Sequence, residues 1–435
     1  MPEIFVEGGH RLRGELYVQG SKNAVLPILA AAVLPEGETV LTRVPVIGDV
    51  AVSLEILSAL GVSVSFADGR LTLCADSLCS AEVPQELGAR MRSSVLFLGS
   101  LLGRRQEVRT AFPGGCAIGS RPVGLHLSVL RQLGAEIFSE GDRLCGRVEQ
   151  FTGGTVTLPS PSVGATEQAL LAAVSAAGET LLRGAAREPE VQILCDFLCA
   201  CGAKIRGQGT GEIRVTPAPL HGCHFEIPGD RIAAGTYLAA AAATSGDVTV
   251  RGIFPAQLRS SLAVFRRLGC LVDEGEDWVR LIREGALRPV SRLETEPYPG
   301  FPTDMQPLIL PLLALASGES RLWENLFENR LGLAGELNRM GADIEVHDRL
   351  AVIHGVESLA GCPVAAHDLR GGAGLLVAAL AARGDSHITG RKYMERGYEE
   401  PERNLAALGA VIRCSGESGQ RRGKREEARW RNSDR

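Results

Sequence analysis

The stretch Leu133-Gly134-Ala135-Glu136-Ile137 joins the expected end of one helix to the expected start of a strand. Glycine readily adopts the left-handed conformation that ends a helix, so this segment predicts a helix C-terminus followed at once by a strand. The pattern recurs about every 70 residues along the chain. Its other copies are Leu60-Gly61-Val62, Cys201-Gly202-Ala203-Lys204-Ile205, Leu268-Gly269-Cys270-Leu271-Val272, Met340-Gly341-Ala342-Asp343-Ile344 and Leu408-Gly409-Ala410-Val411-Ile412.

A second marker, a glycine that ends an apolar helix and begins a strand, has nearly the same period. The copy near 104–109 lacks the glycine. The other copies stand at Gly37, Gly178, Gly246, Gly318 and Gly384. Each repeat therefore predicts a strand, an apolar helix, a strand, an amphipathic helix and two strands. Six such repeats predict an α/β fold of two domains with three units each.

The two helices of each repeat differ in their sequence pattern. The first helix is apolar on nearly all sides, as in 24–34 and 238–243, and should therefore be buried. The second helix, such as 51–60 or 124–133, has polar positions at helical spacing and should lie outside.

Composition limits the classes of function. The chain has 435 residues, 45% of them hydrophobic, and is too long for one ordinary core. A net charge of -5 argues against a general nucleic-acid binder. The chain opens Met1-Pro2-Glu3-Ile4 without the features of a signal peptide, and apolar runs such as 24–34 and 308–316 are too short to span a bilayer. We therefore expect neither nucleic acid nor a membrane as a partner.

The 11 cysteines show no paired spacing, which fits a reducing cytoplasm. Cys195, Cys199 and Cys201 fall on an apolar helix, where core packing is a better interpretation than a metal site. The segment 221–224, His-Gly-Cys-His, is the nearest approach to a metal-binding cluster. We interpret it as a loop that leads into a strand, and we expect no metal.

The segment Gly114-Gly115-Cys116-Ala117-Ile118-Gly119-Ser120-Arg121-Pro122 has the composition of a mobile catalytic loop. Its glycines allow the backbone to approach a ligand closely. A cysteine beside fixed positive charge can act as proton donor or nucleophile. Taken alone, these residues are equally compatible with a surface turn that carries an incidental cysteine.

Each apolar helix starts with a polar or charged cluster, and helix N-termini attract anions. Any one cluster taken alone is more readily an ordinary N-cap. The clusters are 21–23, 90–94, 164–167, 229–231, 303–306 and 368–371. If the helix starts of two domains faced each other, several cations would share one cleft suited to a phosphate and carboxylate substrate. These cations are Lys22, Arg92, Arg121, Arg370 and Arg396.

Asp304 would be the contrasting group in such a cleft. A carboxylate among cations can accept a proton from a substrate hydroxyl. From the sequence alone, the interpretation that we favour for Asp304 is an N-cap of the helix that follows it.

Specific motifs at these positions point to one family. They are Gly20-Ser21-Lys22-Asn23-Ala24, Met91-Arg92-Ser93-Ser94, Gly114 to Val123, Ser162-Val163-Gly164-Ala165-Thr166-Glu167, Ala186-Arg187-Glu188-Pro189-Glu190, Tyr298 to Gln306, Phe327-Glu328-Asn329-Arg330, Asp368-Leu369-Arg370 and Arg396-Gly397-Tyr398-Glu399. In them the chain resembles the UDP-N-acetylglucosamine 1-carboxyvinyltransferases, the enolpyruvyl transferases of the first committed step of peptidoglycan synthesis. The resemblance runs from about residue 4 to about residue 412.

The resemblance implies an inside-out α/β barrel in two domains, with three βαβαββ units in each. One domain would hold residues 22–229, including the loop with Cys116, and the other would combine residues 1–21 with 230–415. Residues 416–435 are rich in Arg, Glu and Ser without apolar periodicity, and should form a disordered tail.

The implied reaction transfers the enolpyruvyl group of phosphoenolpyruvate to the 3′-hydroxyl of UDP-N-acetylglucosamine and releases phosphate, by addition and then elimination. Cys116 matches the family's general acid, which the epoxide antibiotic fosfomycin modifies. Asp304 matches the position proposed as base for the sugar hydroxyl. Lys22, Arg121 and Arg396 match residues that hold phosphoenolpyruvate, and Arg370 lies in the same anion-binding group.

The resemblance also implies how the nucleotide sugar is held. Asn23 and Arg92 match substrate contacts, and Leu326 matches a further nucleotide-sugar contact. Two segments match those that hold the uridine diphosphate, namely Arg121, Pro122, Val123, Gly124 and Leu125 in one and Ser160, Pro161, Ser162 and Val163 in the other. No metal or organic cofactor is implied.

The chain departs from the family pattern mainly around the nucleotide. Gly124 stands where the family usually has Asp, and Ser160 stands near a common Lys. Leu331-Gly332-Leu333 replaces a common aromatic and His, and Gln192 replaces a common acidic residue. These differences bear on nucleotide affinity more than on chemistry.

Two other functions remain to be separated from this one. The shikimate-pathway enolpyruvyl transferases share the fold, but they lack the Gly-Gly-Cys-Ala-Ile-Gly loop. A non-catalytic paralogue that binds a UDP-sugar as a sensor would need neither Cys116 nor Asp304. A phosphate-release assay with both substrates distinguishes the three functions.

Overall fold

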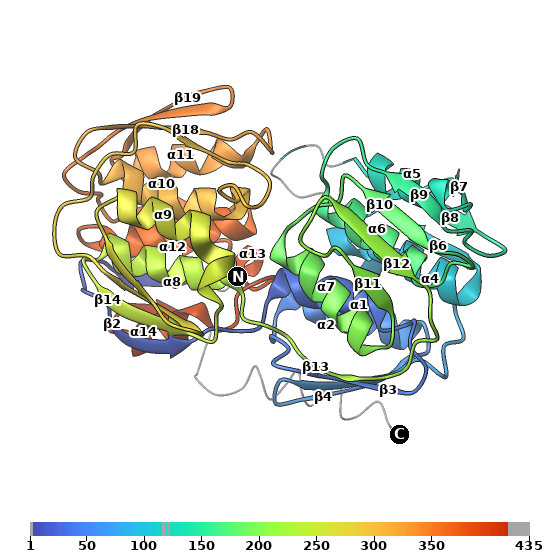
Figure 1. The fold of residues 1–435 in the computed structure, drawn as a ribbon. Coiled ribbons are helices and arrows are strands. Elements are labelled where there is room, and N and C mark those ends of the chain that lie inside the picture. Colours follow the sequence, from blue (N-terminus) through green and yellow to red (C-terminus); the bar gives the residue numbers. More distant parts are fainter. Residues whose placement is uncertain (1–2, 115–118, 120–121, 416–435) are drawn as a thin grey trace. The chain divides into compact units, whose positions relative to one another are not determined.

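The computed structural model describes residues 3–114, 119 and 122–415 (Figure 1). The chain divides into two compact units. The central unit comprises residues 20–114 and 122–228, and the terminal unit comprises residues 3–19, 119 and 229–415. The chain enters the central unit between Gln19 and Gly20 and leaves it between Pro228 and Gly229.

The central unit contains three small sheets, with strand orders β13-β3-β5-β4, β6-β8-β7 and β11-β12-β10-β9. The strands are β3 Glu38–Thr42, β4 Ser63–Ala67, β5 Arg70–Cys74, β6 Glu107–Ala111, β7 Glu136–Glu140, β8 Arg143–Arg147, β9 Gly154–Thr157, β10 Thr180–Arg183, β11 Lys204–Arg206, β12 Glu212–Thr216 and β13 His224–Glu226. The helices are α1 Lys22–Ala31, α2 Gly48–Ala59, α3 Gln85–Gly88, η1 Arg92–Leu96, α4 Phe97–Arg105, α5 Gly124–Gln132, α6 Val163–Ala173 and α7 Pro189–Ala200.

The terminal unit contains three four-stranded sheets, with orders β15-β16-β14-β2, β17-β18-β20-β19 and β21-β22-β1-β23. The strands are β1 Ile4–Glu7, β2 Arg13–Tyr17, β14 Asp247–Arg251, β15 Leu271–Glu274, β16 Trp278–Ile282, β17 Leu293–Glu294, β18 Glu319–Trp323, β19 Asp343–His347, β20 Leu350–His354, β21 Pro363–Ala365, β22 Asp385–Thr389 and β23 Val411–Cys414. The helices are α8 Arg231–Ala243, η2 Pro255–Leu258, α9 Arg259–Arg267, η3 Thr303–Met305, α10 Gln306–Ala314, η4 Arg330–Gly332, α11 Leu333–Arg339, α12 Leu369–Ala381, α13 Arg391–Met394 and α14 Pro401–Ala407.

The six repeats predicted from the glycine markers are the six sheets, each with its helices. Among the described residues, the sheets are separate and none closes into a barrel. The repeat without a marker glycine ends α4 at Gln106, which takes the left-handed conformation itself at φ 64°. In this repeat a non-glycine residue thus ends the helix in the left-handed conformation that glycine adopts more readily.

Two strands pair outside the repeat in which the sequence places them. β2 precedes α1 in sequence but pairs in parallel with β14, with Arg13 opposite Asp247. β13 precedes α8 but pairs in parallel with β3, with His224 opposite Val40. The last repeat lacks a final strand of its own, and β1 completes its sheet between β22 and β23.

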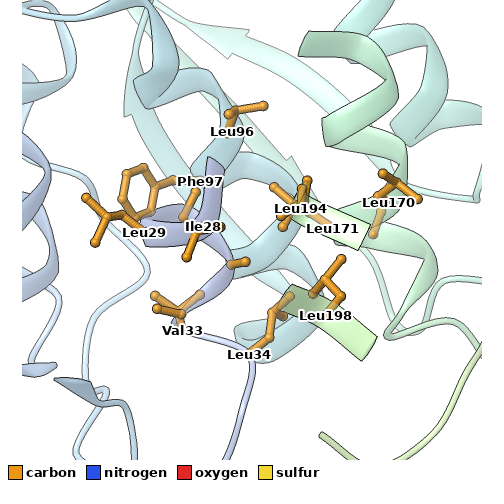
Figure 2. Packing of buried hydrophobic residues seen from close by; sticks show 14 of the residues in the cluster. Ile28, Leu29, Val33, Leu34, Leu96, Phe97, Leu170, Leu171, Leu194 and Leu198 are labelled. Atoms are coloured by element: carbon orange, nitrogen blue, oxygen red, sulfur yellow. The ribbon is translucent and has the colours of Figure 1, made fainter. Parts of the chain in front are cut away.

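The apolar helices are buried as predicted. In the central unit, Ile28, Leu29, Val33 and Leu34 lie near Phe97, Leu170 and Leu194 (Figure 2). Every residue of α8 is buried in the terminal unit. Burial of one such large aliphatic side chain stabilises the fold by roughly 1.5–3 kcal/mol, so these helices account for much of each core.

The prediction that the second helix lies outside is only partly right. Helix α5 exposes Arg131 and Gln132 and buries Val129 and Leu130, as expected. For α2 the prediction is wrong, because most of the helix is buried and only Ser58 and Ala59 are exposed. Helix α2 carries apolar residues on several sides and packs against α1, which explains its deeper burial.

The predicted roles of the cysteines agree with their positions. Cys195 is fully buried on α7, and residues 221–223 form a loop that leads into β13. No group of His, Cys, Asp and Glu side chains suited to a metal ion occurs among the described residues. None of the described helices has the length and hydropathy needed to cross a membrane.

Candidate active site

The starts of three buried helices converge in the terminal unit. Helix α8 begins after Asp230, whose Oδ1 accepts from the backbone N–H groups of Ile232 and Ala233. Helix α12 begins after Asp368, which caps it in the same way. Helix α10 begins after η3, which carries Asp304. The helix dipoles that meet at this point favour negative charge there, as the two capping carboxylates show.

Asp304 lies between two buried arginines. Its Oδ1 accepts from Arg330 Nη2 at 2.5 Å, and its Oδ2 accepts from Arg370 Nε and Nη2 at 3.3 and 3.2 Å. The arginine side chains are 3% exposed, whereas Asp304 is 27% exposed. The carboxylate is therefore the accessible member of a charged cluster. A hydroxyl that approached it would meet an acceptor already fixed in orientation.

The expectation that Asp304 is an N-cap is wrong. Neither η3 nor α10 has a side-chain cap. The two carboxylate oxygens bind the guanidinium groups of Arg330 and Arg370 instead, and in these hydrogen bonds both partners are charged.

Arg370 is held as a permanent cation. Burial alone would lower the pKa of Arg370, but Tyr398, Asp304 and Asp230 together raise it above its ordinary value. Its Cζ lies 5.4 Å from the centre of the Tyr398 ring. Burial in turn raises the pKa of Tyr398, so the phenol stays neutral. This corner of the terminal unit therefore keeps fixed positive charge beside the partly exposed carboxylate of Asp304.

Lys22 stands at the first position of α1 in the central unit. Ser21 caps this helix through a hydrogen bond from the N–H of Ala24 at 3.4 Å. Lys22 Nζ lies 2.6 Å from Asp49 Oδ2, and both side chains are nearly buried. Asp49 comes from the first turn of α2 and fixes the direction of the ammonium group. Asn23 follows Lys22 on the first turn of α1.

The two segments predicted to hold the nucleotide are brought together by α5 and α6. Pro122 and Val123 lead into α5, whose first turn contains Gly124 and Leu125. Ser160 and Pro161 lead to Ser162, which caps α6 by accepting from the N–H of Ala165.

The helices α5 and α6 pack together, and His126 of α5 lies against Gly164 of α6. A Cβ at Gly164 would come within 2.6 Å of His126 Cε1. Arg92 Nη2 also donates to Pro122 O at 3.1 Å. Arg92 and the two segments thus lie at one end of the central unit.

Leu326 lies on a loop that one buried carboxylate organises. Glu324 is fully buried, and its Oε1 accepts from the N–H groups of Leu326 and Phe327 at 2.9 and 3.1 Å. The same carboxylate accepts from the hydroxyls of Thr295 and Thr303. Thr303 is the neighbour of Asp304, so Glu324 ties the Leu326 loop to the segment that carries Asp304.

Arg396 follows α13 on a turn of the terminal unit. Cys116 and Arg121 lie outside the described residues, as does the tail 416–435. The predicted residues therefore fall into two groups. Asp304, Leu326, Arg370 and Arg396 belong to the terminal unit, whereas Lys22, Asn23, Arg92 and both nucleotide segments belong to the central unit.

Three residues that shape this site were not predicted from the sequence. They are Arg330, Glu324 and Asp49. Arg330 is part of the motif Phe327-Glu328-Asn329-Arg330, which could have pointed to it. For Glu324 and Asp49 the sequence offers little signal, because each is a single acidic residue near the end of a strand or the start of a helix.

Similarity to known proteins shows the family and the fold of the chain. The family model described as EPSP synthase (3-phosphoshikimate 1-carboxyvinyltransferase) matches residues 6–405. In fold, the chain is similar to the enolpyruvyl transferase NikO from Streptomyces tendae, with a TM-score of 0.86, 27% identity, and coverage of 95% of this chain and 99% of that one. It is also similar to EPSP synthase from Acinetobacter baumannii, with a TM-score of 0.74, 21% identity, and coverage of 95% and 100%. The predicted enolpyruvyl transferase fold is thereby confirmed.

Curated relatives narrow the family further. UDP-N-acetylglucosamine 1-carboxyvinyltransferase 1 of Carboxydothermus hydrogenoformans is 44% identical over 96% of this chain and 99% of its own length. The enzyme named UDP-N-acetylglucosamine 1-carboxyvinyltransferase in Nitratidesulfovibrio vulgaris strain Hildenborough is 45% identical over 96% of this chain and 100% of its own length. The chain belongs to the EPSP synthase family and, within it, to the UDP-N-acetylglucosamine 1-carboxyvinyltransferases.

Proposed function

We propose that the protein transfers the enolpyruvyl group of phosphoenolpyruvate to the 3′-hydroxyl of UDP-N-acetylglucosamine and releases phosphate. This is the first committed step of peptidoglycan synthesis, and we place it in the cytoplasm. Family membership at 44–45% identity to enzymes of that name supports the proposal. The structural observation that carries it is the partly exposed Asp304 carboxylate held by Arg330 and Arg370.

The addition step needs three kinds of group. The sugar hydroxyl must lose a proton, the methylene carbon of phosphoenolpyruvate must gain one, and the charge that develops between them must be stabilised. Asp304 would accept the hydroxyl proton, and Cys116 would deliver a proton to carbon. Arg370, Arg396, Lys22 and Arg121 would hold the anionic enol. Phosphate then leaves in the elimination step, and no metal or organic cofactor is needed.

The nucleotide sugar would be held mainly by the central unit. Residues 122–125 and 160–163 would contact the uridine diphosphate, with Asn23 and Arg92 as further contacts. Leu326, on the loop held by Glu324, would contribute from the terminal unit.

A phosphate-release assay tests the proposal. Phosphate should appear only when phosphoenolpyruvate and UDP-N-acetylglucosamine are both present, with one enolpyruvyl-UDP-N-acetylglucosamine formed per phosphate. Release that instead requires shikimate 3-phosphate would identify a shikimate-pathway enzyme. Tight UDP-N-acetylglucosamine binding without any phosphate release would identify a sensor.

A second test addresses Cys116. Fosfomycin should add covalently to this thiol, and the mass of one adduct should map to the peptide that contains Cys116. A Cys116→Ser variant is the matched control and should show no adduct. Wild-type protein that remains unmodified in excess drug would contradict the role of Cys116 as a reactive thiol.

A further inference from the structure

Gln19, the last residue before the chain enters the central unit, clamps a turn of the terminal unit. Its Nε2 donates to Gly397 O at 3.0 Å, and its Oε1 accepts from the N–H of Glu399 at 2.7 Å. A single side-chain amide thus binds the backbone on both sides of Tyr398. These hydrogen bonds fix the turn on which Arg396 stands, although Gly397 lies 378 residues away from Gln19 along the chain.

Gln19 is itself held in place at its backbone. Its carbonyl accepts from the N–H of Asp230 at 2.9 Å. Asp230 caps α8, so Gln19 is tied to the first turn of a fully buried helix. The side chain is therefore presented from a fixed base, which lowers the entropy cost of holding the turn.

Tyr398, the residue inside the clamp, is fixed at its far end as well. Its side chain is buried, and its hydroxyl lies 2.9 Å from Thr236 Oγ1. The Thr236 hydroxyl donates to Ile232 O at 2.8 Å. Because a hydroxyl has only one proton, Thr236 must accept the hydrogen bond from Tyr398. The ring of Tyr398 then faces the guanidinium of Arg370.

A continuous set of contacts therefore links Gln19 to the candidate active site. The clamp sets the position of Tyr398, the Tyr398 ring contacts Arg370, and Arg370 donates to Asp304. On the other side of Gly397, the clamp limits the backbone that carries Arg396.

We propose that Gln19 is a positioning residue that sets the affinity of the site for phosphoenolpyruvate by fixing Arg396 and Arg370. This inference rests on the proposed function, since it assigns those arginines to the anionic enol. Small displacements of charged groups weaken binding strongly, so loss of the clamp should be visible in the kinetics.

The decisive variant is Gln19→Met, which keeps the length of the side chain and removes both polar atoms. We expect the KM for phosphoenolpyruvate to rise roughly tenfold, as the loss of two hydrogen bonds would give. The KM for UDP-N-acetylglucosamine should stay within about twofold, because the predicted nucleotide segments lie in the other unit.

A second variant, Gln19→Glu, gives a readout that a purely structural role would not. Above the pKa of the introduced carboxyl group, the carboxylate can still accept from Glu399 but repels the Gly397 carbonyl. Once protonated, it can again donate to that carbonyl. Relative to wild type at each pH, the KM of this variant for phosphoenolpyruvate should therefore recover as the pH falls. The Gln19→Met variant should show no such recovery.

Asn338 supplies the matched control. Its Nδ2 donates to Ile344 O at 2.8 Å and its Oδ1 accepts from the N–H of Ile344 at 3.0 Å, so it forms the same kind of clamp elsewhere in the terminal unit. The Asn338→Leu variant should lower the melting temperature about as much as Gln19→Met, with unchanged KM values. Equal KM values in wild type and Gln19→Met, or a rise shared by both substrates, would overturn the proposal.

Failure of the proposed function is distinguishable from failure of this inference. A wild-type protein that releases no phosphate would refute the proposed function. In that case the role of Gln19 is tested by calorimetry. Phosphoenolpyruvate is titrated into wild type and into Gln19→Met, each saturated with UDP-N-acetylglucosamine. About tenfold weaker binding by the variant would support this role, and equal or undetectable binding in both would overturn it.

Discussion

Asp304 is the residue at which chemistry can be separated from binding. Replacement by Asn keeps the side-chain shape and one acceptor oxygen but removes the charge that would draw the proton from the sugar hydroxyl. We expect the kcat for phosphate release to fall by about 100-fold or more, the usual range for loss of a general base. Substrate binding, measured by calorimetry, should change much less.

The control for this variant is Asp247→Asn. Asp247 also binds an arginine through both oxygens, since Arg280 Nε and Nη2 each lie 2.8 Å away. This pair is half-exposed at the start of β14 and does not belong to the proposed site. The kcat of the Asp247→Asn variant should equal that of wild type. A similar loss in both variants would show that Asp304 matters only for folding.

Gly124 tests how nucleotide affinity depends on a single side chain. Among the described residues, a Cβ at this position would meet no atom within 4 Å, and α5 has neither an acidic residue in its first turn nor a side-chain cap. Gly124→Asp should therefore stabilise the helix by about 0.3–1 kcal/mol. If residues 122–125 hold the uridine diphosphate, the KM for UDP-N-acetylglucosamine should fall severalfold. An unchanged KM together with a raised melting temperature would place the substrate elsewhere.

Glu167 should make stability depend on pH. Burial, and then the charges of Glu190 and Glu188, raise the pKa of this carboxyl well above its ordinary value. The unfolded chain ionises Glu167 near its ordinary pKa while the folded protein keeps it neutral. Stability is therefore lost as the pH rises from the unfolded pKa to the folded pKa, at about 1.4 kcal/mol per pH unit.

The Glu167→Gln variant should remove this slope. Its free energy of unfolding should match wild type at about pH 4 and exceed it increasingly at higher pH. Denaturant titrations at several pH values measure the difference. A difference that does not vary with pH would mean that Glu167 ionises normally in the folded protein.

At the residue scale, the partners of a polar side chain such as Asp304 could not be predicted from the sequence. Asp304 was expected to cap the helix after it because only local spacing can be judged from a sequence. Its actual partners, Arg330 and Arg370, stand 26 and 66 residues further along the chain. Such pairs depend on how repeats are placed in three dimensions, which no local pattern reveals.

At the scale of elements, the glycine markers predicted the helices and strands because each marker reflects a local backbone requirement. The exchange of β2 and β13 between sheets was not predictable in the same way. Both strands precede an apolar helix, as the repeat demands, but their side-chain pattern does not determine which neighbouring edge they join. The deep burial of α2 was also missed, since it depends on contact with α1.

Gly355 shows a steric limit on how closely two segments of one repeat pack. It follows β20, and a Cβ there would lie 1.5 Å from the carbonyl oxygen of Ala316. The oxygen belongs to the backbone, and the backbone N–H groups of Gly355 and Val356 donate to Gly318 O and Ala314 O, so neither segment can move without breaking hydrogen bonds. Gly355→Ala should lower the free energy of unfolding by about 1–3 kcal/mol, the usual cost of overpacking.

The matched control is Gly335→Ala in the interior of α11, where a Cβ would meet nothing within 4 Å. This change should stabilise the protein by about 0.5–1 kcal/mol, because alanine favours the helix. Chemical denaturation of both variants measures the two effects. A destabilising Gly335→Ala or a neutral Gly355→Ala would contradict the packing described here.

At the scale of the whole molecule, each unit has a hydrophobic core of its own. The buried apolar residues form two separate clusters, one in the central unit and one in the terminal unit. All three sheets of the central unit are complete once β13 is included. We infer that the two units are the folding domains of the protein.

The positions of its two chain ends suggest that the central unit can be produced as a separate fragment. Ser21 N donates to Pro228 O at 2.8 Å, so the two ends of residues 20–228 lie side by side. A fragment of residues 20–228 should therefore fold alone, with a single cooperative thermal transition and the circular dichroism of a mixed α/β protein. The expected cost of excision is small, because no strand of these three sheets is left behind.

A shorter fragment, residues 20–216, tests whether strand exchange matters to this domain. It lacks β13 and the fully buried Ile227, and it leaves the edge of β3 unpaired. An open edge favours association between molecules, so this fragment should melt at lower temperature and aggregate on gel filtration. If the shorter fragment were as stable and monomeric as the longer one, β13 would contribute nothing to the stability of the sheet. The folding domain would then end before Pro228.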